Sequence, residues 1–118
     1  MLTAVEQGIP LIVVVLNNAT LQIERELMQK FYGRTALTDY VRNDTGEPHN
    51  PDFVAWARAM GAAGVKASRP DEVRTAVRDA LQARTATVID VGIDPDSEGY
   101  RSIHYRYPMD FADPVIPR

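Results

Sequence analysis

The sequence predicts an α/β fold, a partial three-layer sandwich whose sheet of about three strands is mostly parallel. Two observations predict it. Residues 11–16 and 87–93 are apolar, β-branched runs of strand length, and segments with the spacing of amphipathic helices lie between them. Apolar runs that do not alternate with polar residues are typical of strands covered on both faces, as in a parallel sheet.

The first half of the chain predicts a helix, a buried strand and a second helix. Residues 1–7 have the pattern of the end of a helix that stops at Gly8. The strand 11–16 follows, and we expect it to be the most buried of the sheet because it carries no polar residue. Residues 34–49 are polar and are expected to form a loop after a helix that Gly33 ends. That helix is indicated by apolar residues at every fourth position: Ile23, Leu27 and Phe31.

The second half predicts two helices and two strands. Asn50 suits the N-cap of a helix that stops at Gly61. Its apolar face is made of Phe53, Trp56, Ala57 and Met60, which we expect in the core. Residues 63–67 form a short strand, and a start like a capping box at 68–71 opens the next helix. The buried stripe of that helix consists of Val73, Ala76, Val77, Ala80 and Leu81. The strand 87–93 completes the sheet.

We expect two parts in the chain of 118 residues. Residues 1–94 form the folded domain, which at this size buries roughly two-thirds of the surface its unfolded chain exposes. Residues 95–118 hold four of the eight prolines and three of the five tyrosines, and we expect an ordered but irregular tail. This tail would lie on a surface of its own domain or of a partner.

Composition excludes several classes of protein. The chain has no cysteine, which excludes disulfides, zinc–thiolate sites and thiol nucleophiles and fits a cytoplasmic location. The net charge is −3 and the basic residues are scattered, so we expect no nucleic-acid partner. The longest apolar run, residues 11–16, is far too short to span a membrane.

Candidate chemistry lies where the strand 11–16 ends. In open α/β sheets ligands bind at the carboxyl ends of the strands, and here the sequence is Asn17-Asn18-Ala19-Thr20. An Asn amide oxygen is a hard, neutral ligand, and a backbone carbonyl two residues later can join it on Mg²⁺. The free N–H groups of the following helix favour an anion. The same residues are also typical of a simple strand-to-helix turn, and their spacing alone favours that interpretation.

A resemblance to a known family favours the ligand site. Several segments, in this order and spacing, resemble the pyrophosphate-binding domain of thiamine-diphosphate enzymes, and the fit is closest to the acetolactate synthase group. The resemblance covers about residues 1–94. The segments are Thr3–Pro10, Val13–Asn18, Phe31-Tyr32-Gly33, Asn50–Val54, Ala59-Met60-Gly61, Asp71-Glu72-Val73 and Val88–Val91.

The resemblance implies roles for the residues around the Asn pair. Asn18 would bind Mg²⁺ through its side chain and Thr20 through its backbone carbonyl. Asn17 would help to shape the turn beneath the diphosphate, and Ala19 would be one of the cofactor-binding residues. Leu21 and Ile23 would face the thiazolium of the cofactor. The residues on the substrate side would be Glu24 and Leu27, and no catalytic residue is assigned in this chain.

Departures from the family pattern qualify the function. The family's Gly-Asp-Gly motif falls ahead of Met1, so its Mg²⁺-binding aspartate is missing, as is the glutamate that activates the cofactor. Without a carboxylate we expect weak Mg²⁺ binding. Gln22 replaces a usual Gly, and Leu27 and Glu24 also depart from the pattern, which leaves the 2-keto acid open. We expect the cofactor-binding portion of an acetolactate-synthase-like enzyme, inactive by itself. The alternative is a non-catalytic remnant or interaction module that keeps the fold.

The resemblance also implies partners. Active sites of this family usually lie between subunits, which implies a homo-oligomer, or a complementary chain that carries the missing half. The strand expected to neighbour residues 11–16 is missing as well, and an unpaired strand edge favours association. We therefore predict that the chain self-associates or pairs with the missing piece.

Other candidates have simpler interpretations. His49 and His104 are expected to be solvated, and Ser68 is better explained by helix capping than as a nucleophile. An acidic turn after the last strand consists of Asp94, Asp96 and Glu98, and it is explained more simply as a solvated turn than as a cation site. A flavodoxin-like module is a third possibility, but it lacks a phosphate-loop signature.

Overall fold

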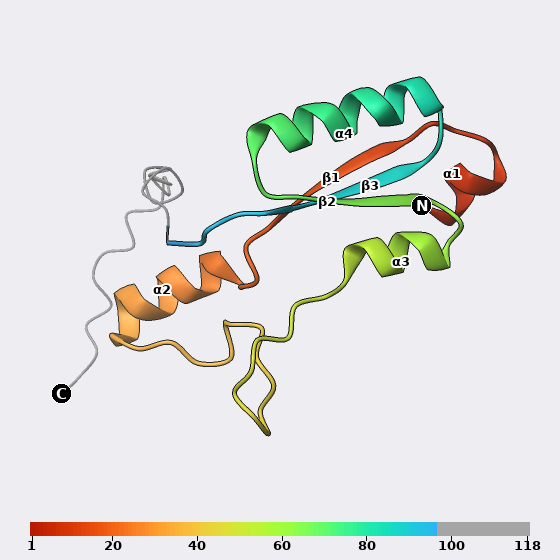
Figure 1. The fold of residues 1–118 in the computed structure, drawn as a ribbon. Coiled ribbons are helices and arrows are strands. Elements are labelled where there is room, and N and C mark those ends of the chain that lie inside the picture. The colour runs from red at the N-terminus through yellow and green to blue at the C-terminus, as the bar shows by residue number, and fades with distance from the viewer. Residues whose placement is uncertain (97–118) are drawn as a thin grey trace.

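The computed structural model describes residues 1–96, so nearly all of the expected tail, with His104, Glu98 and three tyrosines, lies outside the described residues. The elements alternate between helix and strand, and Figure 1 shows their arrangement. They are α1 (Leu2–Glu6), β1 (Ile12–Asn17), α2 (Gln22–Tyr32), α3 (Phe53–Ala59), β2 (Ala63–Ala67), α4 (Pro70–Ala83) and β3 (Thr87–Gly92).

The three strands form one parallel sheet in the order β1-β3-β2. Thr87 of β3 lies opposite Ile12 on one side and Ala63 on the other. The fold class predicted from the sequence is confirmed. The expectation that β1 is the most buried strand is wrong: β3 is central and buried along most of its length, whereas β1 is an edge strand. An unbroken apolar run shows that a strand has two apolar faces, but not whether another strand lies on each side.

Helices cover both faces of the sheet, which completes the three layers (Figure 1). On one face α1 and α3 pack around Ala4, Ala57 and Val88. On the other face α4 packs around Ala76 and Ile89. Within the described residues, no helix is long and apolar enough to cross a membrane.

The predicted start of α3 needs correction. Asn50 is not its N-cap. Asp52 is, and its Oδ1 accepts a hydrogen bond from the backbone N–H of Ala55 at 2.9 Å. This bond lowers the pKa of the Asp52 carboxyl below its ordinary value. An ionised Asp two residues later outcompetes Asn50 because it brings a full negative charge to the helix N-terminus.

Two large side chains expected in the core are exposed instead. Trp56 of α3 is 51 % exposed and Leu81 of α4 is 64 % exposed. The sides of these helices that contact the sheet are lined by alanines such as Ala57 and Ala80. A sheet of three strands is too narrow to cover the flanks of the helices, where the larger side chains lie.

The second helix stands apart from the sheet (Figure 1). It ends at Gly33 as expected, because Gly33 adopts the left-handed conformation with φ 64°. The apolar residues Ile23 and Phe31 that indicate this helix are exposed. The segment 34–49 is a loop, as expected, held by isolated bridges between Thr20 and Asp39 and between Val41 and Pro48.

Candidate functional site

The candidate site is the turn that joins β1 to α2 at the carboxyl edge of the sheet. Asn17, the last residue of β1, lies opposite Gly92 of β3, and its carbonyl accepts a hydrogen bond from Ile93 N–H at 3.0 Å. The first helical residue of α2 is Gln22. The four intervening residues therefore start at the point where parallel α/β sheets bind ligands.

Asn17 anchors this turn to the central strand. Its Nδ2 donates to Oδ1 of Asp90 at 2.9 Å, and its Oδ1 accepts from the N–H of Ala19 at 3.2 Å. Asp90 is only 7 % exposed, so the bond satisfies a carboxylate inside the sheet. Ala19 has a φ of 55°, a left-handed conformation that costs a non-glycine residue energy. The bond to Asn17 helps to offset that cost.

The next two polar residues fold over the turn. Asn18 Oδ1 accepts from Thr20 N–H at 3.3 Å, which is a long and weak bond. The loop after α2 closes against the same residues, since Leu21 N–H donates to the Thr38 carbonyl at 2.7 Å and Tyr40 N–H to the Ala19 carbonyl at 3.1 Å. Neither of these two backbone hydrogen bonds uses the Thr20 carbonyl. Thr20 itself is buried.

A buried hydroxyl beside the turn has no partner among the described residues. Thr38 is 3 % exposed, and its Oγ1 makes no hydrogen bond there. An unsatisfied buried hydroxyl is costly, so Thr38 is an unusual residue of this loop. Thr38 was missed by the sequence analysis because nothing in a polar loop indicates which residue becomes buried.

Polar contacts continue along α2. Thr20 Oγ1 donates to Gln22 Oε1 at 3.4 Å, and Gln22 Nε2 donates to Glu26 Oε1 at 2.9 Å. Arg25 lies 3.8 Å from Asp39 and 3.7 Å from Asp96. A cleft of about 540 Å³ runs along this side of the helix and includes residues Gln22, Arg25, Lys30 and Asp96.

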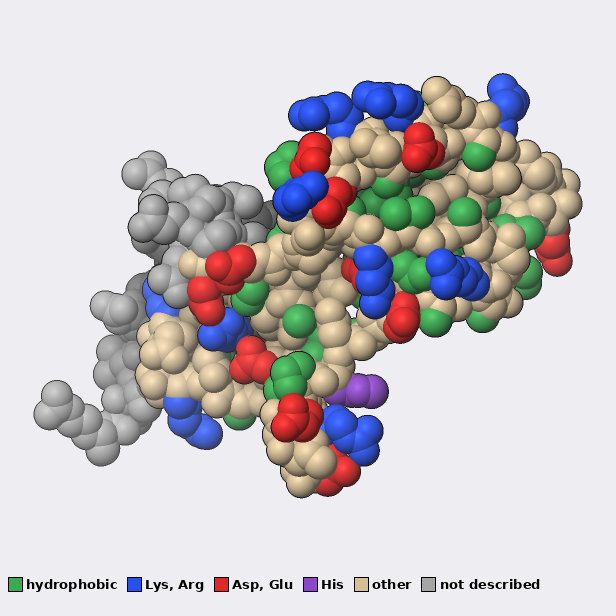
Figure 2. Space-filling model, in the orientation of Figure 1, with side chains coloured by type: hydrophobic (Ala, Val, Ile, Leu, Met, Phe, Trp, Pro, Cys, Tyr) green, Lys and Arg blue, Asp and Glu red, His purple; other side chains and the backbone are tan. Residues whose placement is uncertain are grey.

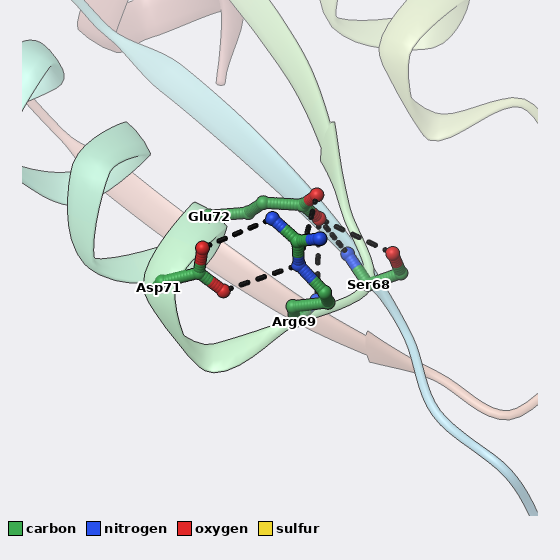
Figure 3. Close-up of polar contacts among 4 residues, drawn as sticks. All are labelled: Ser68, Arg69, Asp71 and Glu72. Atoms are coloured by element: carbon green, nitrogen blue, oxygen red, sulfur yellow. Dashed lines mark hydrogen bonds and ion pairs between the residues drawn. The ribbon is translucent and has the colours of Figure 1, made fainter.

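The start of α4 follows the end of β2, so it also lies at the carboxyl ends of the parallel strands (Figure 3). Glu72 Oε2 accepts hydrogen bonds from Ser68 N–H at 2.8 Å, Ser68 Oγ at 3.2 Å and Arg69 N–H at 3.2 Å. The Ser68 N–H is the main reason why the pKa of Glu72 is lowered. Ser68 thus serves the helix start, as expected, but the N-cap position itself belongs to Arg69.

The structure brings the first four predicted residues, Asn17, Asn18, Ala19 and Thr20, into one turn. Leu21, Ile23 and Glu24 follow with exposed side chains, and Leu27 is half-buried one turn further along α2. His49 is exposed. The acidic turn after β3 is closed on itself, because Asp94 Oδ1 accepts from Asp96 N–H at 2.9 Å.

Sequence reasoning also missed Asp90 and Arg25. Asp90 carried a signal, since it is the one charged residue inside the apolar run 87–93. A lone carboxylate in a strand that otherwise carries no charge indicates a specific polar partner. Arg25 gave no comparable signal, because charged residues are ordinary on helix surfaces.

The turn offers the kind of ligand atoms that a magnesium ion prefers, but these ligands lack the negative charge that usually holds the ion. Asn18 Oδ1 and the Thr20 carbonyl are oxygens, which Mg²⁺ prefers, but both are neutral. Among residues 1–96, no three His, Asp or Glu side chains gather as a metal cluster would require. On the face drawn in Figure 2, basic side chains are interspersed with acidic ones over α4 and the strands.

The fold and site together define a parallel α/β domain with a ligand-type turn at its carboxyl edge. Comparison with known proteins makes this specific. Residues 1–91 match the family model described as thiamine pyrophosphate enzyme, C-terminal TPP binding domain. The chain belongs to this family.

Relatives of known name are acetolactate synthases and other enzymes of the family. The chain is similar to an acetolactate synthase large subunit of Parasynechococcus marenigrum, with 32% identity over 77% of this chain and 14% of the relative. It is also similar to an acetolactate synthase of Bacillus subtilis, with 29% identity over 78% of this chain and 15% of the relative. The chain therefore spans about a seventh of the length of these relatives.

A solved structure agrees with the fold. The thiamine diphosphate-dependent 4-hydroxybenzoylformate decarboxylase of Rhodococcus jostii RHA1 superposes with a TM-score of 0.66 at 26% identity. The match covers 79% of this chain and 16% of that one.

Proposed function

We propose that this chain is the portion of an acetolactate-synthase-like enzyme that holds thiamine diphosphate and Mg²⁺, in the cytoplasm, for a reaction on a 2-keto acid. When bound, thiamine diphosphate supplies the carbanion that attacks such substrates. The residues of this chain bind and orient the cofactor and carry out no covalent step. The observation that supports this most is the turn 17–20, whose Asx-type hydrogen bonds hold two neutral oxygen ligands close in the chain.

In this proposal each residue of the turn has a distinct task. Asn18 and the Thr20 carbonyl bind the metal. Asn17 positions them, because its amide joins the turn to Asp90 of the central strand. The first N–H groups of α2 lie beside them and favour the negative charge of a diphosphate.

The side chains that follow would form the wall beside the reacting end of the cofactor. Leu21 and Ile23 are exposed, so apolar surface is available to contact the thiazolium. Glu24 lies in the first turn of α2 and Leu27 lies about one turn further along, on the side where we place the substrate. The exposed apolar surface is the feature that a bound cofactor would cover.

Binding by this chain alone is expected to be weak, and catalysis by it alone to be absent. Two neutral oxygens provide no countercharge for Mg²⁺, which ordinarily takes one or two carboxylates. We propose that a carboxylate from another polypeptide segment completes the site.

Calorimetric titration of thiamine diphosphate with Mg²⁺ into the whole chain tests this directly. We expect heats that fit millimolar affinity and disappear in Asn18→Ala. Asn43→Ala, which removes an amide from the exposed loop, is the matched control and should bind as the wild type does. Absence of any Asn18-dependent binding at millimolar cofactor would contradict the proposal.

A second candidate is favoured by the neutral charge of the two oxygen ligands in the turn. The chain would then be a non-catalytic module that keeps the fold without binding the cofactor. The same titration separates the two functions. For the non-catalytic module we expect only heats of dilution, equal for wild type and Asn18→Ala.

A further inference from the structure

A buried carboxylate of the central strand lies beside the turn 17–20. Asp90 of β3 lies opposite Val15 of β1 and is only 7 % exposed. Asn17 follows Val15 by two residues, so its side chain lies on the same face of the sheet as that of Asp90. The two side chains meet diagonally across the strands, and Asn17 Nδ2 donates to Asp90 Oδ1 at 2.9 Å.

The carboxylate at this position decides which way the Asn17 amide points. A carboxylate only accepts hydrogen bonds, whereas an amide has a donor end and an acceptor end. Asp90 therefore pairs with the NH₂ group of Asn17 and not with its oxygen. This leaves Asn17 Oδ1 on the other side, where it accepts from the Ala19 N–H at 3.2 Å. An amide at position 90 would have nearly the same shape, but either end of the Asn17 amide could then face it.

The conformation of Ala19 depends on this orientation. Ala19 has a φ of 55°, in the left-handed region that non-glycine residues rarely adopt. A turned Asn17 amide would place its NH₂ group against the Ala19 N–H, where two donors repel each other. The Ala19 carbonyl accepts from Tyr40 N–H at 3.1 Å, so the same residue also determines where the loop after α2 closes. The orientation of one amide is thus passed on to the backbone of the whole turn.

We propose that Asp90 is a positioning residue, which fixes the orientation of the Asn17 amide and thereby holds the oxygens of Asn18 and Thr20 in place. Ala19 connects the two effects, because it lies between these residues in the chain. That the two oxygens bind a metal rests on the proposed function, whereas the orientation of the amide does not. The proposal also explains why a carboxylate occurs in a strand that otherwise carries no charge.

Three variants separate the orientation of the amide from the shape and the charge of the side chains. Asp90→Asn keeps the shape but allows the Asn17 amide to turn. The double variant Asn17→Asp with Asp90→Asn exchanges the two groups: the carboxylate at 17 accepts both from the amide at 90 and from the Ala19 N–H, so the orientation is fixed again. The matched control is Asp79→Asn, which removes the same charge from the exposed side of α4.

Hydrogen exchange of the whole chain, without metal or cofactor, measures the turn itself. In Asp90→Asn we expect the Ala19 amide to exchange about tenfold faster, and in the double variant and Asp79→Asn at the wild-type rate. The Ile93 amide donates to the Asn17 carbonyl at 3.0 Å and reports on the pairing of β1 with β3, so its rate should not change.

Two results of this experiment would overturn the positioning role. One is an Ala19 rate in Asp90→Asn that equals the wild-type rate, or that the double variant fails to restore. The other is faster exchange of Ile93 together with Ala19, which would mean that Asp90 only stabilises the pairing of the strands.

Titration of thiamine diphosphate with Mg²⁺ then measures the effect on the two oxygens. We expect Asp90→Asn to bind about tenfold more weakly than the wild type and the double variant to recover the affinity. A wild type without binding that depends on Asn18 contradicts the proposed function, and the exchange rates still decide the role of Asp90. A wild type that binds, together with an Asp90→Asn variant that binds equally well, overturns the positioning role.

Discussion

The two edge strands of the sheet, β1 and β2, are similar in length but have different neighbours. At the β2 edge, Arg58 donates to the Gly64 carbonyl at 3.5 Å, and Lys66 lies 3.9 Å from Asp52. At the β1 edge, no described side chain reaches the outward groups of Val14. The difference lies in α3, which packs closely on β2 and supplies Arg58 and Asp52. An edge strand is thus protected by what packs beside it, and β1 has no such neighbour among the described residues.

The largest effect is expected from Gly64→Ala, which breaks the contact that brings α3 to the β2 edge. A Cβ at Gly64 would lie 2.9 Å from both Cα and O of Val54, so α3 must shift. We expect a loss of about 1–3 kcal/mol in the free energy of unfolding, measured in urea. Gly92→Ala is the control, because a Cβ there meets nothing within 4 Å. Equal losses in both variants would contradict this account.

The next largest effect concerns the tie between β1 and the central strand. Asn17→Ala removes the donor to Asp90 and leaves a buried carboxylate without that partner. We expect a loss of about 1–2 kcal/mol in unfolding free energy. Asn18→Ala loses only a long, local bond and should cost clearly less. If both substitutions cost the same, Asn17 does not anchor the turn.

The same two edges show what the sequence could predict. The order of helices and strands follows from apolar spacing and from stops such as Gly33, and these signals are local. Which strand is central depends on how distant segments pair, so the unbroken run of β1 indicated the wrong strand. Exposure of Trp56 and Leu81 depends on the width of the sheet, which no local pattern records.

The residues of the candidate site also fall into two groups, those that a local sequence pattern indicates and those that only the folded structure reveals. Asn17 to Thr20 could be located from sequence because a strand end followed by a helix start is a local feature. Asp90 and Thr38 join the turn through contacts formed only on folding, across 73 positions in the case of Asp90 and Asn17. Partners of this kind need the tertiary structure.

A smaller effect is expected at the start of α4, beside the protected edge. The backbone N–H of Ser68 holds the pKa of Glu72 below its ordinary value of 4.5. The ionised Glu72 carboxylate therefore stabilises the folded state at pH values above that ordinary pKa. This stabilisation is lost as the pH falls through the lower pKa that Glu72 has in the folded state. Glu72→Gln should lower the melting temperature at neutral pH and flatten its decline in acid. Asp71→Asn changes the same charge in the same turn and serves as the control in thermal scans, where an unchanged acid slope in Glu72→Gln would refute the role of Ser68.

The smallest effect on stability, and the sharpest test of the comparison, comes from removing the charges that cover β2. Arg58→Ala combined with Lys66→Ala takes away exposed groups whose ion pair and long hydrogen bond contribute little, so we expect unfolding free energy to change by less than about 0.5 kcal/mol. These charged groups lie over the outer edge of β2, and their loss should leave the packing of α3 on β2 unchanged. The single substitution Arg74→Ala on α4 removes one positive charge away from this edge and serves as the control in urea unfolding. A loss of more than about 1 kcal/mol in the double variant, but not in Arg74→Ala, would mean that the charged side chains help to hold α3 against β2.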